Sequence, residues 1–131
     1  MKKLLTIILI IVLYSIQTIA SSINKKDIPG YWQDTKPEVS NGRLLVFKSN
    51  GKYEEYYYYN AKEKISDKPK SVVWSGFGKW SFSLNVLQTK ITSSASNTNM
   101  HNSYHIIMLT KTKMTLLNTA GGKRTYLKRV K

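Results

Sequence analysis

The feature that most constrains the fold is a series of short runs rich in Tyr, Val, Ile, Leu, Phe, Trp and Thr, which begins just after Pro29. Such runs are typical of β-strands. Turn residues separate them, and both Ser49-Asn50-Gly51 and Ala120-Gly121-Gly122 favour tight hairpins because Asn and Gly tolerate a positive φ. No segment after Pro29 has the helical periodicity of a crossover between parallel strands. The predicted strands are residues 31–34, 43–48, 52–59, 72–83, 85–92, 104–110, 113–118 and 123–130.

Eight consecutive strands predict an all-β fold, a small antiparallel up-and-down barrel of about eight strands. Closure into a barrel removes both exposed edges of such a sheet. The interior of a barrel of this size is either filled by side chains or holds one small ligand. Two polar stretches, residues 60–71 and 93–103, contain few apolar residues, and we expect them to be mobile loops.

The first 20 residues, MKKLLTIILIIVLYSIQTIA, have the pattern of a secretory signal peptide, with two lysines before an apolar run and small residues before the expected cleavage site. An uncleaved membrane anchor is the alternative, but Tyr14, Ser15 and Gln17 interrupt the apolar run. The sequence therefore predicts an exported protein, periplasmic or secreted, that is soluble once the leader is removed. The remaining residues, 21–131, form one predicted domain. Because the chain has no cysteine, neither a lipid anchor nor a disulfide is expected.

The chain is strongly basic, with 21 Lys and Arg against seven Asp and Glu. Two of the lysines lie in the leader, which leaves a net charge of +12 on residues 21–131. This excess favours anionic partners at low salt. For an exported protein these are lipid head groups, envelope polymers or acidic glycans, and nucleic acid is an unlikely partner. A net charge of this size also keeps a protein soluble, which explains it without any anionic partner.

Five motifs follow one another along the chain. They are Gly30-Tyr31-Trp32, LLVFKSNGKYEEY (44–56), GFGKWSF (76–82) with a strand around Leu87, YHIIMLTKTKMTLLN (104–118) and KRTYLKR (123–129). In this order the chain resembles the lipocalin-like domains of bacterial exported proteins, in the calycin group. The resemblance implies that Gly30 and Trp32 belong to the closed base of a barrel, with Arg124 or Arg129 packed across the indole. A guanidinium stacked on an indole face is a favourable arrangement.

Two aromatic groups are the candidate ligand-binding residues. Residues 52–59 read KYEEYYYY, and alternation places Tyr53, Tyr57 and Tyr59 on one face and Tyr56 and Tyr58 on the other, without deciding which face points inward. A second group surrounds Gly76 and Gly78. Tyrosine can orient a ligand in a pocket, and it packs equally well in a β-core, so both interpretations stay open. The candidates are Tyr53, Tyr57, Tyr59, Trp74, Trp80 and Phe82.

The sequence gives little support for catalysis, a metal or a cofactor. His101 and His105 are the only histidines, and no cysteine or nearby carboxylate completes a metal site. The seven carboxylates form no spaced pair in an apolar setting, and no nucleophile elbow, phosphate loop or zinc motif occurs. We therefore expect a non-enzymatic binding protein for a small apolar or amphipathic ligand.

The alternative is a filled barrel whose basic surface binds an acidic envelope component or an acidic protein. In the last predicted strand, alternation puts Arg124 and Lys128 on one face and Lys123, Arg129 and Lys131 on the other. One of these sets could form an anion-binding stripe with Lys111 and Lys113 of the preceding hairpin.

Overall fold

A short 3-10 helix and eight β-strands make up the computed structural model, which describes residues 23–38 and 40–131. The predicted leader, residues 1–20, lies outside the described residues, and export stays a prediction. The elements are η1 (Lys25–Asp27), β1 (Gly30–Asp34), β2 (Gly42–Phe47), β3 (Lys52–Tyr58), β4 (Val72–Ser83), β5 (Val86–Ser93), β6 (Asn99–Leu109), β7 (Lys113–Asn118) and β8 (Arg124–Arg129).

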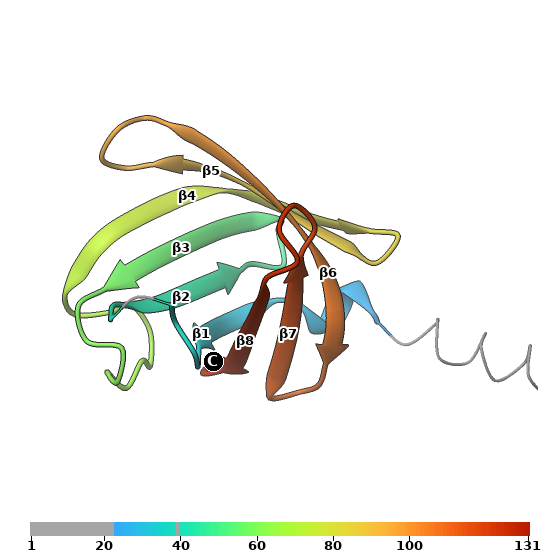
Figure 1. Cartoon of the computed structure of the whole chain (residues 1–131), viewed down its shortest axis with the longest axis horizontal. Coiled ribbons are helices and arrows are strands. Elements are labelled where there is room, and N and C mark those ends of the chain that lie inside the picture. Colours follow the sequence, from blue (N-terminus) through green and yellow to red (C-terminus); the bar gives the residue numbers. More distant parts are fainter. Residues whose placement is uncertain (1–22, 39) are drawn as a thin grey trace, which may run out of the picture.

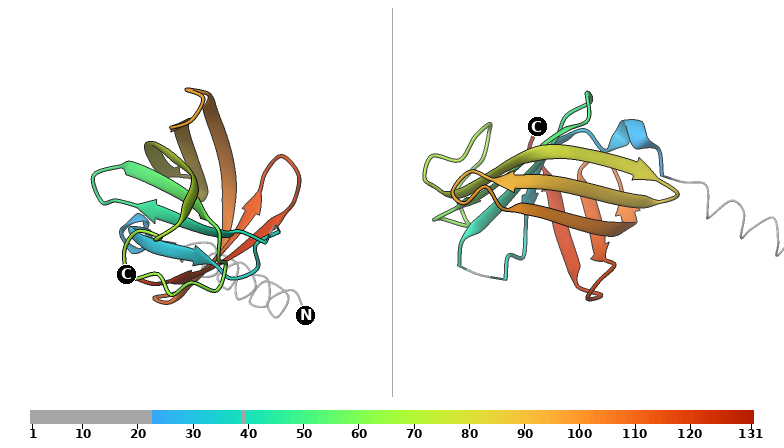
Figure 2. Two further views of the ribbon diagram at one scale, coloured as in Figure 1. Left: turned by 90° about the vertical axis from the view of Figure 1, so that its left-hand side faces the viewer. Right: turned by 90° about the horizontal axis from the view of Figure 1, so that it is seen from above.

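The strands form one closed barrel in chain order, each antiparallel to its neighbours (Figure 1). β1 closes the barrel by pairing with β8, where Trp32 lies opposite Arg129 and Asp34 opposite Leu127. Two further views show the strands wrapping round to meet (Figure 2). The predicted all-β, eight-strand, up-and-down barrel is confirmed. In the described part of the chain, no helix is long and apolar enough to cross a membrane.

The predicted strand bounds hold to within a residue or so, except in β6. This strand begins at Asn99, five residues before the predicted start at Tyr104, so the prediction of a loop was wrong for residues 99–103. These polar residues form a strand because β5 continues to Ser93 and offers them a partner, with Thr92 opposite Asn99 and Gln88 opposite Ser103. The Thr92 hydroxyl also donates to the Asn99 side-chain oxygen at 2.8 Å. The backbone ladder thus replaces the apolar content that the segment lacks.

The apolar core fills the half of the barrel nearest its base. Inward-facing side chains from all eight strands meet there, and Phe47 packs edge-on against Trp80 with ring centroids 5.7 Å apart. The ring centroid of Tyr53 lies 4.9 Å from that of Phe47, and Tyr53 is fully buried. The core members with the least exposure are Trp32, Leu45, Phe47, Tyr53, Leu87, Met114 and Leu116.

A second apolar cluster lies on the outside of β2 and β3, under the segment of residues 60–71. Tyr56 and Tyr58 pack there with Leu44, Val46 and Ile65, and Ile65 is only 7% exposed. The segment therefore packs on the barrel, contrary to the prediction that it lacks the apolar content to pack. Both tyrosine rows of β3 are buried, one inside the barrel and one beneath this segment.

Trp32 closes the base of the barrel, and Arg129 lies across it. The guanidinium carbon of Arg129 is 4.2 Å from the centre of the indole. Its three nitrogens donate hydrogen bonds of 2.6 to 2.7 Å to the backbone carbonyl oxygens of Asp27, Pro29 and Lys111. The indole N–H donates to the Ile28 carbonyl at 2.9 Å. Gly30 leaves room for this arrangement, because a Cβ there would collide with the Arg129 guanidinium.

Candidate functional site

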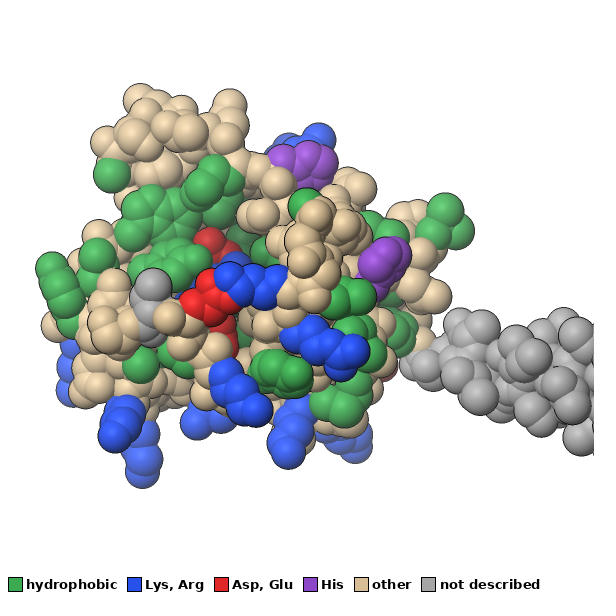
Figure 3. All heavy atoms as spheres, in the orientation of Figure 1, with side chains coloured by type: hydrophobic (Ala, Val, Ile, Leu, Met, Phe, Trp, Pro, Cys, Tyr) green, Lys and Arg blue, Asp and Glu red, His purple; other side chains and the backbone are tan. Residues whose placement is uncertain are grey.

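The end of the barrel opposite Trp32 contains a cavity of about 520 Å³. Inward-facing residues at the ends of β1, β3 and β7 and at the starts of β2, β4, β6 and β8 line it. The cavity is within the usual range for a small-molecule pocket, about 300 to 1,000 Å³. Figure 3 shows one face of the molecule on which acidic and basic side chains meet near the centre, beside apolar ones.

A buried ion pair between Arg43 and Glu55 lines the cavity on its inner side. Arg43 Nη2 lies 2.8 Å from Glu55 Oε1, and the two side chains are 14% and 5% exposed. The same carboxylate oxygen accepts a hydrogen bond from the Tyr53 hydroxyl at 2.7 Å. Arg43 Nη2 also donates to the Tyr104 hydroxyl at 3.4 Å, whereas its buried Nε has no hydrogen-bond partner among the described residues. This polar network separates the cavity from the apolar core.

The surroundings fix the protonation of this network. Burial alone would lower the pKa of Arg43, but the charge of Glu55 opposes it, and the net effect raises that pKa well above its usual value. Burial, together with Glu55, raises the pKa of the Tyr53 hydroxyl well above its usual value. Burial also raises the pKa of Tyr104. Arg43 is therefore charged and the tyrosine hydroxyls remain hydrogen-bond donors at neutral pH.

Tyr57 and Trp74 form an aromatic wall beside the ion pair. They are direct cross-strand partners, and their rings pack edge to face with centroids 5.5 Å apart. The Trp74 indole N–H donates to the Ser93 hydroxyl at 2.8 Å, which holds the ring in place. Gly76 allows this position because a Cβ there would lie 2.7 Å from the Trp74 ring. The arrangement offers a ligand an apolar surface next to charged groups.

The six sequence-predicted ligand-binding residues separate into three groups. Tyr57 and Trp74 line the cavity. Tyr53 and Trp80 belong to the packed core, and Phe82 packs against its edge, so these three lie among core side chains. Tyr59 is 67% exposed and lies outside the cavity.

The two candidate arginines of the base lie at opposite ends of the barrel. Arg129 packs across Trp32, whereas Arg124 pairs with Leu117 and lines the rim of the cavity. The rim also carries an ion pair between Glu38 and Lys123. Asp34 lies nearby, and its Oδ1 accepts a hydrogen bond from the Lys36 backbone N–H at 2.9 Å. Burial raises the pKa of Asp34 above its usual value.

Arg43, Glu55 and Tyr104 line the cavity but were not among the residues predicted from the sequence. A signal for the ion pair was available, because strict alternation places Arg43 on the same face as Leu45 and Phe47, and Glu55 on the same face as Tyr53. Two charged residues that alternate with interior side chains on adjacent strands indicate an interior pair.

Among residues 23–38 and 40–131, no group of three or more His, Cys, Asp or Glu side chains could hold a metal ion. Both histidines lie on β6 and are exposed, so the expectation that His101 belongs to a loop was wrong.

Comparisons with known proteins show the fold and not a family. No protein-family model matches the chain, and no curated protein matches it. The chain is similar to a protein from Bacteroides uniformis ATCC 8492 whose structure was determined by NMR, with a TM-score of 0.54 and 17% sequence identity. The match covers 82% of this chain and 92% of that protein. At this identity the similarity shows a shared small β-barrel fold alone.

Proposed function

We propose that the protein binds a small amphipathic molecule in the cavity at the open end of the barrel, without chemical conversion of it. The observation that carries this proposal is the buried Arg43–Glu55 pair facing a cavity of about 520 Å³. Burying an ion pair costs desolvation free energy, and apolar residues of similar size often stabilise a core as well or better. A buried pair that faces a cavity is therefore better explained by a ligand than by packing.

The lining of the cavity indicates the class of ligand. Tyr57 and Trp74 provide an aromatic wall, while Arg43 and Glu55 provide charged hydrogen-bonding groups within the same space. A purely apolar ligand would displace water from these charged groups without offering them hydrogen bonds, at a cost in binding free energy. The lining therefore favours an amphipathic molecule over the purely apolar one that the sequence left open.

The test uses four probes that share a ten-carbon chain and differ in the polar head: decanoate, decylamine, decanol and decyl glucoside. Each is titrated into the ¹⁵N-labelled protein. We expect at least one to shift the amide resonances of Tyr57, Trp74 and Asn102 and to raise the thermal midpoint with concentration. The head that binds best identifies the polar class of the ligand.

Two adjacent residues of β6 provide matched variants. Asn102 lines the cavity, and Ser103, next to it, has its side chain on the opposite face of the strand. Asn102→Trp fills the cavity and should abolish binding, whereas Ser103→Trp should leave it unchanged. The proposal fails if no probe shifts cavity resonances, or if both variants bind as the unaltered protein does.

A further inference from the structure

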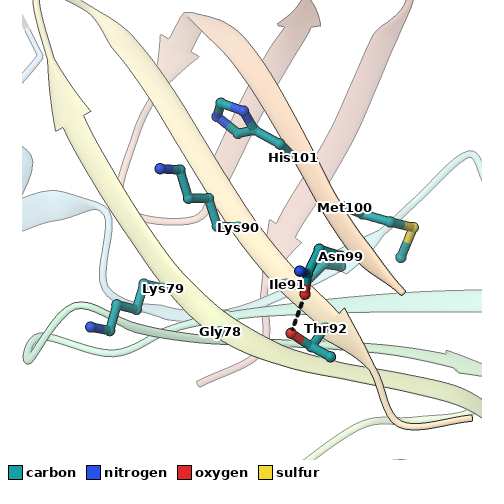
Figure 4. Close-up of a pocket in the computed structure, with 8 residues that line it drawn as sticks. All are labelled: Gly78, Lys79, Lys90, Ile91, Thr92, Asn99, Met100 and His101. Carbon is teal, nitrogen blue, oxygen red and sulfur yellow. Dashed lines mark hydrogen bonds between the residues drawn. The ribbon is translucent and has the colours of Figure 1, made fainter. Parts of the chain in front are cut away.

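A row of basic side chains crosses four adjacent strands on the outer face of the barrel. Lys52 lies directly opposite Lys79, Lys79 opposite Lys90, and Lys90 opposite His101. All four are exposed. In Figure 4 the side chains of Lys79, Lys90 and His101 point to the same side of the sheet, and Met100 points to the other. We call these four residues the cross-strand row.

The direct opposition of these lysines costs stability, since like charges directly opposite each other in a sheet repel. None of the ion pairs among the described residues includes Lys52, Lys79 or Lys90. Lysines often protect the edge strands of open sheets, but this barrel is closed and β4 and β5 have partners on both sides. Neither edge protection nor folding stability explains the alignment, which is the arrangement expected of a binding surface.

The charged side chains of β4, β5 and β6 are all basic. All seven acidic residues of the chain lie between Asp27 and Asp67, and the 64 residues from Lys68 onward contain eleven Lys and Arg and no Asp or Glu. β4, β5 and β6 therefore carry no carboxylate that could neutralise the row. On one side, the neighbouring outward residues are Glu54 of β3, which pairs with Lys48, and the neutral Phe77, Thr92 and Asn99.

Three members of the row, Lys79, Lys90 and His101, line an open hollow of about 450 Å³ over β4, β5 and β6, and Lys52 extends the row beyond it on β3. Gly78 lies at this hollow, where a Cβ would collide with the Lys90 carbonyl oxygen, so β4 and β5 approach each other closely there. Thr92 and Asn99 add a hydroxyl and an amide to the lining. Adjacent strands lie about 4.8 Å apart, so the three lysines place regularly spaced charges over about 10 Å, and His101 follows one strand further on.

We propose that this hollow binds an acidic polysaccharide, with successive carboxylates on the cross-strand row and sugar hydroxyls on Thr92 and Asn99. A linear chain matches a row that is one residue wide and lies in a hollow. Single-stranded nucleic acid would need successive aromatic platforms, and Phe77 is the one exposed aromatic ring beside the row in the described chain. A membrane surface would favour a protruding basic and apolar tip over a hollow.

The experiment compares binding of a galacturonate hexamer with binding of its methyl ester, which has no charge. We expect the acid to bind and the ester not to bind, and the affinity for the acid to fall as NaCl is raised. Chemical shifts of ¹⁵N-labelled protein should change at Lys79, Lys90 and His101 and not at the cavity residues Arg43 and Tyr57. This pattern separates the site from the proposed ligand cavity.

Two charge-matched triple variants test the location. Lys52→Gln, Lys79→Gln and Lys90→Gln together should weaken hexamer binding at least tenfold. Lys111→Gln, Lys113→Gln and Lys128→Gln together remove the same charge from β7, β8 and the turn before β7, and should weaken it less than threefold. If the first variant does not fold, Lys79→Gln alone replaces it, paired with Lys113→Gln. Equal loss in both variants, or tighter binding of an oligothymidylate of equal charge or of phosphatidylglycerol vesicles, would overturn the proposal.

Discussion

Arg129 donates three hydrogen bonds to two separate segments of backbone at the base of the barrel, residues 27–29 and Lys111, in addition to stacking on Trp32. Hydrogen bonds from a charged donor contribute roughly 1.5 to 3 kcal/mol in mutational measurements, and a cation over an indole adds about 0.5 to 2 kcal/mol. Because these terms are not additive, we expect Arg129→Ala to lower the free energy of unfolding by about 2 to 4 kcal/mol.

Urea denaturation measures this loss, and Arg124→Ala is its control. Arg124 is exposed and lies at the other end of β8, so its removal should change the free energy of unfolding by less than about 0.5 kcal/mol. Similar losses in the two variants would mean that Arg129 does not close the base.

Asp34 and Glu54 have opposite pKa shifts, so replacing each with its neutral amide should change the free energy of unfolding in opposite directions. Burial raises the pKa of Asp34 above its usual 3.8, so its ionised form destabilises the fold, and stability falls as pH rises from 3.8 through the folded pKa. Asp34→Asn should therefore raise the free energy of unfolding at pH 7 and have little effect below pH 3.8. Its Oδ1 can still accept the Lys36 hydrogen bond.

Glu54 has the opposite pKa shift to Asp34. Burial raises the pKa of Glu54, but hydrogen bonds from Tyr56 and Lys48 outweigh it, and the net effect lowers the pKa below its usual 4.5. Its stabilisation is complete above pH 4.5 and lost as pH falls through the folded pKa. Glu54→Gln should thus lower stability at pH 7, because it removes the charge that pairs with Lys48 and that strengthens the Tyr56 hydrogen bond by about 1 kcal/mol over a neutral acceptor, and converge with the unaltered protein in acid. Chemical denaturation at pH 7 and pH 3 measures the free energy of unfolding of both variants. If Asp34→Asn and Glu54→Gln change it in the same direction at pH 7, the opposite pKa shifts of the two carboxylates are contradicted.

At the scale of elements, alternation and turn residues were enough to predict the strands but not what covers them. The pattern of β3 separates Tyr53 and Tyr57 from Tyr56 and Tyr58, yet both rows are buried, because a loop packs over the outer one. The contacts of Ile65 join residues far apart in the chain, and a single apolar residue in a polar loop gives no periodic signal. The same limit applies to Arg43 and Glu55, whose pairing depends on the register of β2 with β3.

Ile65 holds the segment of residues 60–71 against β2 and β3. Its side chain packs with Tyr56 and Tyr58, and Gln33 Nε2 adds hydrogen bonds to the Tyr58 hydroxyl at 2.6 Å and the Glu63 carbonyl at 3.0 Å. We expect Ile65→Ala to cost about 2 kcal/mol and to release the segment. Trypsin should then cleave after Lys62, Lys64 or Lys70 at least tenfold faster than in the unaltered protein.

Mass spectrometry of timed digests identifies the cleavage sites. Leu84→Ala is the control, because this side chain is 95% exposed at the tip of the β4–β5 hairpin. Unchanged cleavage of the Ile65→Ala variant between residues 60 and 71 would show that the segment does not depend on its apolar contact.

At the scale of the whole molecule, the charges are divided between two parts of the sequence. The acidic residues accompany β1 to β3, and the part from β4 to β8 carries basic residues alone. The ion pair between Lys123 and Glu38 joins the two parts at the rim of the cavity. Self-repulsion of a highly charged protein destabilises its compact state, and salt screens that repulsion. The thermal midpoint should therefore rise as NaCl is increased from 10 mM to 300 mM.

Lys79 lies at the point where this repulsion is most concentrated, between Lys52 and Lys90 on adjacent strands. Lys79→Glu converts two repulsive cross-strand pairs into two attractive ones, each worth roughly 0.2 to 1 kcal/mol. The variant should be more stable than the unaltered protein at 10 mM NaCl and gain less from added salt. Lys64→Glu makes the same change of charge in the segment of residues 60–71, outside the cross-strand row, and should give a smaller gain. Equal gains in the two variants would mean that net charge alone, and not the alignment of the row, destabilises the barrel.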